Sequence, residues 1–334
     1  MPSASVRDVA ALAGVSVGTV SNVLNRPDRV SQDSIARVRA AIDELGFVRN
    51  DAARQLRAGR SKAIGMVILD VRNPFFTDVA RGAEDQAAQA GYSVILGNSD
   101  ENADREGAYL DLFEEQRVRG VLLSPYGDVA ERLRRLRSRG IPAVLVDRPS
   151  SDSAFSSVSV DDVSGGTMAA EHLIERGRTR IAFVGGPLDI RQVSDRLEGA
   201  RRAVAAHPGT SLEVVPVSAL GIDDGHSAGQ TIAERPASRW PDAVFAANDL
   251  LATGLLQALS ASDTGVVPGR IALIGYDDIA FARAATVSLS SIRQPSEEIG
   301  RTAMRLLLET AENPGLEPQH IVFQPELVAR ASTR

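Results

Sequence analysis

The chain has 334 residues, which is enough for two or three domains with cores of their own. It contains no cysteine, which excludes disulfides, thiol catalysis and thiolate metal sites and fits a cytoplasmic protein. The net charge of −6 is unevenly spread, because residues 1–62 hold ten basic and six acidic side chains and the remainder is acidic. This asymmetry favours a DNA-binding segment joined to a separate regulatory domain. No leader-like or membrane-spanning apolar run occurs, so we expect neither secretion nor membrane insertion.

Two short helices are predicted within residues 6–25. Their apolar residues recur at spacings of three and four, as a helix with one buried face requires. These residues are Val6, Val9, Ala10 and Ala13, followed by Val15, Val20, Val23 and Leu24. Between the two sets, Gly14 can adopt a positive φ, and Ser16 can cap the second helix. The pattern predicts a helix-turn-helix, whose second helix enters the DNA major groove, with an ordinary αα-hairpin as the alternative.

A third amphipathic helix is predicted over residues 31–45. Ser31 is its candidate N-cap and Gly46 its candidate C-cap. One face carries Val30, Ile35, Val38, Ile42 and Leu45. Three helices of this size can close a small core, which favours the DNA-binding interpretation.

This segment resembles the LacI/GalR family of bacterial transcription regulators. The resemblance rests on Val6, Asp8, Val9, Ala10, Ala13, Gly14, Val15, Ser16, Thr19, Val20, Ser21, Val23, Leu24, Asn25, Val30, Ser31, Leu45, Gly46 and Phe47, and it continues to the end of the chain. It implies a headpiece over residues 1–46, a homodimer and a pseudo-palindromic double-stranded DNA operator.

The resemblance also implies which head residues contact DNA. Val17, Gly18 and Asn22 would face base edges, where Asn can pair with adenine and Val can contact the thymine methyl group. Thr19 and Ser21 carry hydroxyls suited to phosphates, and Arg29 is included among the DNA contacts. The alternatives are a solvated polar face for Asn22 and a core contact for Val17.

Residues 47–61 are predicted to form a hinge helix. The stretch alternates apolar residues with arginines and is too short to be a stable helix alone. In the family such a hinge orders on DNA, pairs with its dimer mate and inserts a leucine into the minor groove. Asn50, Ala53 and Leu56 match that pattern, and a plain linker is the alternative.

From residue 62 onward, short β-branched runs alternate with helical segments. The expected strands cover 63–69, 93–96, 120–123, 143–146, 181–184, 213–217, 243–246 and 271–274. The expected helices cover 76–90, 104–116, 129–139, 163–176, 196–206, 225–234, 249–259 and 295–310. Strands that alternate with helices predict parallel sheets covered on both faces.

The alternating segments resemble the two-lobe fold of periplasmic sugar-binding proteins. We expect the first lobe to hold residues 62–160 and 292–323, and the second to hold 161–291 and 324–334. In such folds the ligand lies at the carboxyl ends of the strands. The helices over 76–90 and 104–116 are expected to carry the dimer interface, as in the family.

The candidate ligand residues follow the ends of predicted strands or begin helices. They are Asn73, Phe75, Phe76, Asp147, Arg148, Arg196 at the start of a helix, Asn248, Asp277 and Gln294. The polar members could pair with vicinal hydroxyls, and the phenylalanines could cover the C–H face of a sugar. Taken singly, each could instead be a turn, a helix cap, a surface ion pair or a core residue. Together they resemble the set of ribose-type proteins, although no aromatic residue occurs near Ile222.

Neither a cofactor nor a metal site is expected. The sequence shows no P-loop, its four histidines are far apart, and no catalytic triad or carboxylate pair can be identified. We therefore predict a cytoplasmic repressor controlled by a monosaccharide, with a pentose as the first candidate. A sugar-binding transport module and an α/β enzyme are the rival interpretations. Whether the ligand releases the protein from DNA or is required for binding is left open, with release favoured.

Overall fold

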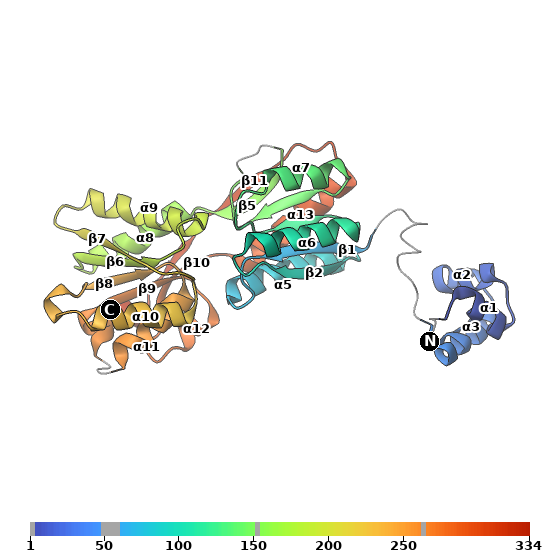
Figure 1. Ribbon diagram of the computed structural model, residues 1–334, viewed down its shortest axis with the longest axis horizontal. Coiled ribbons are helices and arrows are strands. Elements are labelled where there is room, and N and C mark those ends of the chain that lie inside the picture. Colours follow the sequence, from blue (N-terminus) through green and yellow to red (C-terminus); the bar gives the residue numbers. More distant parts are fainter. Residues whose placement is uncertain (1–3, 48–60, 151–153, 262–264) are drawn as a thin grey trace. The chain divides into compact units, whose positions relative to one another are not determined.

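The computed structural model describes residues 4–47, 61–150, 154–261 and 265–334 (Figure 1). Its contacts divide the chain into two compact units, Met1–Arg60 and Ser61–Arg334. The second unit consists of two lobes, each built on one six-stranded sheet. No helix among the described residues is long and apolar enough to cross a membrane.

The first unit contains the three expected helices. They are α1 (Val6–Ala13), α2 (Val17–Asn25) and α3 (Gln32–Leu45), with a 3-10 turn at Pro27–Arg29. The Ser16 side chain accepts from the Thr19 N–H at 3.0 Å, and Ser31 accepts from the Ser34 N–H at 3.4 Å, so both predicted caps are confirmed. Gly14 ends α1 in the left-handed conformation, with a φ of 61°. The core is formed by Val9, Ala10, Ala13, Val20, Val23, Ile35, Val38 and Ala41.

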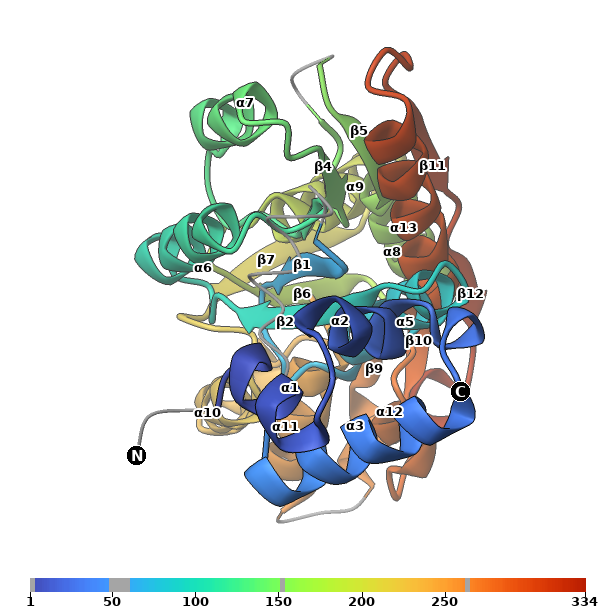
Figure 2. The same cartoon turned by 90° about the vertical axis from the view of Figure 1, so that its right-hand side faces the viewer.

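Lobe 1 is a parallel sheet with the strand order β11-β5-β4-β3-β1-β2. Its strands are β1 (Ala63–Ile68), β2 (Ser93–Asn98), β3 (Val121–Leu123), β4 (Ala143–Val146), β5 (Ser156–Val160) and β11 (His320–Phe323). Its helices are α5 (Pro74–Gln89), α6 (Ala103–Glu115), α7 (Ala130–Ser138) and α13 (Ser296–Glu312). Helices α6 and α7 cover one face and α13 covers the other, as Figure 2 shows.

Lobe 2 is a second sheet with the order β12-β10-β9-β8-β6-β7. Its strands are β6 (Arg180–Gly185), β7 (Ser211–Pro216), β8 (Ala243–Ala246), β9 (Ala272–Asp277), β10 (Ser290–Arg293) and β12 (Glu326–Val328). Only β12 is antiparallel among its described strands. The helices are α8 (Asp162–Glu175), α9 (Arg191–Ala206), α10 (Ile222–Ala233), α11 (Asp249–Ser260) and α12 (Ala280–Ala284). The expected two-lobe, largely parallel α/β architecture is confirmed.

The segments that cross between lobes differ from the prediction. β5 and β10 are strands, although their serine-rich sequences lack a hydrophobic pattern. Ser156 and Ser157 can be buried in β5 because their hydroxyls bond to the Gln319 N–H and the His320 ring. All of β10 belongs to lobe 2, so the chain crosses after Arg293 and not at residue 292. The chain crosses again between β11, which belongs to the sheet of lobe 1, and β12, which belongs to the sheet of lobe 2.

Candidate functional site

The exposed face of α2 carries the residues expected to meet DNA. Val17 is 43 % exposed, so it is not the core contact that its apolar character allowed. Gly18, Asn22 and Arg29 are also exposed, while Thr19 and Ser21 are half-buried. The predicted hinge residues Asn50, Ala53 and Leu56 lie outside the described residues. Among the described residues, the exposed face of α2 therefore combines the apolar Val17 with Gly18 and the polar Asn22.

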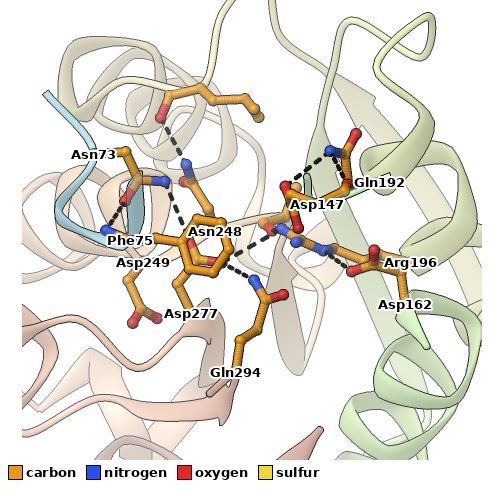
Figure 3. Close-up of polar contacts among 12 residues, drawn as sticks. Asn73, Phe75, Asp147, Asp162, Gln192, Arg196, Asn248, Asp249, Asp277 and Gln294 are labelled. Carbon is orange, nitrogen blue, oxygen red and sulfur yellow. Dashed lines mark hydrogen bonds and ion pairs between the residues drawn. The ribbon is translucent and has the colours of Figure 1, made fainter. Parts of the chain in front are cut away.

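The cleft between the two lobes contains a cavity at the carboxyl ends of the strands (Figure 3). Seven of the nine predicted ligand residues line it, namely Asn73, Phe75, Phe76, Asp147, Arg196, Asn248 and Asp277. The lining also includes Leu69, Asp70, Glu101, Ile190, Gln192, Val193, Leu220 and Leu250. The sequence pattern had not indicated these eight residues. The rule that ligands bind at the carboxyl ends of the strands (the strand-end rule) thus located the site but did not identify all of its lining residues.

Asp147 follows β4 and is held from the opposite lobe. Its backbone has a φ of 59°, and its side chain is 3 % exposed. Gln192 of α9 donates from Nε2 to the Asp147 carbonyl oxygen at 2.5 Å and to Oδ2 at 2.8 Å. Oδ1 is buried in the cavity wall and has no hydrogen-bond partner among the described residues. Burial raises the pKa of Asp147 well above its ordinary value, and nearby Asp162 raises it further, while Arg196 opposes the shift.

Arg196 lies in the second turn of α9, which begins at Arg191, so it does not open the helix as predicted. Its Nε donates to Asp162 Oδ1 at 2.8 Å, and its Nη1 donates to the Ala247 carbonyl oxygen at 2.7 Å. The guanidinium carbon lies 3.7 Å from the centre of the Tyr276 ring. These contacts hold the cation at the floor of the cleft.

Asp277 ends β9 and joins three parts of the cleft. Its φ of 101° lies in a region that residues with a side chain rarely adopt. Its carboxylate accepts from Asn73 Nδ2 of lobe 1 at 3.0 Å and from Gln294 Nε2 at 2.8 Å. Arg196 Nη1 lies 3.7 Å from its Oδ1. Burial raises the pKa of Asp277, and Arg196 opposes that rise. The Asn73–Asp277 and Gln192–Asp147 bonds connect the lobes.

Three further predicted residues line the cavity. Asn248 caps α11 by accepting from the Leu251 N–H, and its Nδ2 donates to the Leu220 carbonyl oxygen. Phe75 and Phe76 lie edge to face, with ring centres 5.0 Å apart.

Two predicted ligand residues do not line the cleft cavity. Arg148 donates to the Gly127 carbonyl oxygen at 2.7 Å and borders a different, smaller cavity. Gln294 stands behind Asp277 and contacts its carboxylate. A strand-end position places a residue near the cleft, but adjacent residues point in different directions. Asp147 therefore faces the cavity and Arg148 does not.

Some of the residues that were missed had a usable signal. Glu101 follows β2, so the strand-end rule could have included it. Gln192 could not be found this way, because the predicted helix began too late to contain it. Leu220 occupies the region where an aromatic residue was sought and not found.

The cleft can offer several hydrogen bonds and an apolar surface within a small volume. The enclosed space is about 30 Å³, which has room for little more than water. A larger ligand must therefore displace some of the bonds between lobes. No group of three or more His, Cys, Asp or Glu side chains that could hold a metal ion occurs within the described ranges.

Comparison with known proteins adds independent information. Residues 5–50 match the family described as bacterial regulatory proteins, lacI family, and residues 170–333 match a periplasmic binding protein-like domain. The chain is 34 % identical to the ribose operon repressor of Escherichia coli K12, over 98 % of this chain and 99 % of the relative. It resembles a transcriptional regulator CelR–cellobiose complex with a TM-score of 0.72 and 32 % identity, over 98 % and 99 % of the two chains. A ribose-bound LacI family regulator from Enterococcus faecium gives a TM-score of 0.74 and 27 % identity, over 81 % and 98 %.

Proposed function

The chain belongs to the LacI family of bacterial regulatory proteins, and we propose that its effector is a monosaccharide, with a pentose as the first candidate. The protein is a DNA-binding repressor with a sugar-binding effector domain, and it acts in our proposal as a cytoplasmic homodimer on a pseudo-palindromic operator. Val17, Gly18 and Asn22 would face the bases. Asn50, Ala53 and Leu56 would form the hinge.

The observation that carries the proposed ligand class is the unsatisfied, buried Asp147 Oδ1 in the cavity wall. A buried carboxylate oxygen without a partner is costly, so a ligand that brings a hydroxyl donor gains free energy there. Asp277 and Asn248 supply further polar contacts, and Phe75 and Phe76 supply an apolar face. Vicinal hydroxyls with a C–H face fit this combination. A ribose-bound relative supports the pentose.

The mechanism follows from the bonds between the lobes. The Asn73–Asp277 and Gln192–Asp147 hydrogen bonds link the lobes, and a sugar that takes over these carboxyl groups changes the preferred angle between the lobes. That angle sets the spacing of the two hinge segments in the dimer. Ligand and operator are thereby coupled, and each changes the affinity of the other by the same factor. We expect the sugar to release the operator.

Titration calorimetry on the full-length protein tests the ligand class. The panel contains pentoses, hexoses, cellobiose and purines, and we expect binding by a pentose before the others. Tight binding by a purine alone would overturn the proposal. A gel-shift assay with the same compounds measures the coupling, and operator binding should weaken as salt rises because phosphate contacts release counterions.

The alternative function is a sugar receptor without a role on DNA. The basic head and its capped helix-turn-helix weigh against it, because transport needs only the two lobes. If a sugar of the panel binds but no compound changes the operator affinity, the protein binds a sugar without being regulated by it.

A further inference from the structure

Acidic side chains outnumber basic ones in the lining of the cleft cavity. Four carboxyl groups line it, from Asp70, Glu101, Asp147 and Asp277, against a single cation, Arg196. Arg196 is already engaged, because it donates to Asp162 at 2.8 Å and to the Ala247 carbonyl oxygen at 2.7 Å. The wall therefore has little positive charge to offer a bound anion.

Glu101 differs from the other acids in the wall. Asp70 pairs with Arg72 at 2.9 Å, and Asp100 pairs with Arg72 at 2.8 Å and with Arg105 at 2.7 Å. The Glu101 carboxylate forms no hydrogen bond or ion pair with any other residue that the structure describes. It is half-buried, and it stands in a left-handed turn, with a φ of 53°, whose N–H is bonded to the Leu69 carbonyl oxygen. Its charge is thus available to a ligand.

Charged groups from both lobes act on Glu101. Asp70, Arg72 and Asp100 lie on its own lobe, and Asp224 of α10 acts from the other lobe. Asp224 is held in place, because its Oδ1 accepts from Ser218 Oγ at 3.0 Å and from the Ala219 N–H at 3.2 Å. Glu101 and Asp224 therefore place like charges on opposite lobes, and an anionic ligand between them would add a further one.

We propose that Glu101 is a specificity-determining residue that makes the cleft accept an uncharged, hydroxyl-bearing effector and reject its phosphate ester. The inference rests on the proposed function. Asp147 Oδ1 provides the complementary half of the selection, because this buried carboxyl oxygen has no hydrogen-bond partner and can pair with a sugar hydroxyl. The effector is accordingly the free sugar.

The state of Glu101 depends on pH near neutrality. The pKa of Glu101 is raised to about 7, mainly by burial and also by Asp70, while Arg72 opposes the rise. Above that pH the side chain is charged and rejects a phosphate ester most strongly. Below it the side chain is neutral, so the rejection weakens. Discrimination should therefore be larger at pH 8 than at pH 6.

The test compares ribose with ribose 5-phosphate by titration calorimetry on the full-length protein. If another sugar of the panel binds more tightly, that sugar and its phosphate are used. We expect the ester to bind at least about tenfold more weakly at pH 8. In Glu101→Gln the ratio of the two affinities should shrink several-fold. Glu317→Gln removes the same charge from an exposed loop and serves as the matched control.

Glu101→Gln also controls for the titration of the phosphate itself, because only the wild-type ratio should depend on Glu101 as pH changes. Equal or tighter binding of the ester would overturn the inference and leave the proposed sugar site standing. An unchanged ratio in Glu101→Gln would overturn the role of Glu101. If neither free sugars nor their esters bind, the proposed function fails, and this inference fails with it.

Discussion

Replacing Arg196 by Met removes the cation on which the buried acids of the cleft depend. Arg196 is 5 % exposed, and its Nε lies 2.8 Å from Asp162 Oδ1, which is equally buried. Loss of one partner from a buried ion pair costs about 3–5 kcal/mol, because the other charge stays buried without compensation. We expect the free energy of unfolding at pH 8 to fall by about 3 kcal/mol. This is the low end of that range, because Asp162 can take up a proton when its partner is lost.

The loss should be smaller at acidic pH. Burial raises the pKa values of Asp147, Asp162 and Asp277, and Arg196 opposes each rise, so its removal raises them further. A carboxyl whose folded-state pKa exceeds the unfolded value of about 4 binds more protons in the native state. Stability then decreases as pH rises through the folded-state pKa. The difference between wild type and variant should therefore be larger at pH 8 than at pH 5.5.

Urea denaturation followed by tryptophan fluorescence measures this effect. Trp240 is the only tryptophan of the chain, and it packs against the core of lobe 2, so its signal reports the lobe that holds Arg196. Arg202→Met is the control, since this arginine of the same helix forms only an exposed pair with Glu198, worth at most about 1 kcal/mol. Adding Asp162→Asn to Arg196→Met should restore part of the loss. A loss below about 1 kcal/mol, or one that does not change with pH, would refute the reasoning.

Three further predictions concern the head and hinge. Ser16→Ala removes the side chain that caps α2 and should destabilise the head by about 1 kcal/mol, measured by thermal melting. An unchanged melting temperature would contradict the role of the cap. Asn22→Ala should weaken operator binding by about 1–3 kcal/mol and relax the preference at one base pair, whereas equal loss on all sequences in a gel shift would argue against base contact. Leu56→Ser should reduce operator affinity and DNA bending together in a circular-permutation gel assay, and unaltered bending would refute a wedge at this position.

The amino-acid sequence was sufficient to predict most of the local elements and the architecture, but not the strands β5, β10, β11 and β12. The caps at Ser16 and Ser31 and the positive φ at Gly14 depend on neighbours within four residues, so local chemistry alone specifies them. The alternation of strands and helices likewise predicted parallel sheets, because hydrophobic periodicity follows directly from burial, and the resemblance to periplasmic sugar-binding proteins implied the two lobes. The position of Asp277 at the cleft followed from its place at the end of a strand.

Only the tertiary structure decided what depends on distant partners. The serines of β5 are buried because β11, more than 150 residues away, supplies their hydrogen bonds, and no local pattern reveals that. Gln192 reaches Asp147 because the lobes face each other, and Arg148 turns away from the cavity to meet the Gly127 carbonyl oxygen. Which side chains share a cleft depends on how the two lobes are placed, and that placement is set by packing between segments far apart in the chain.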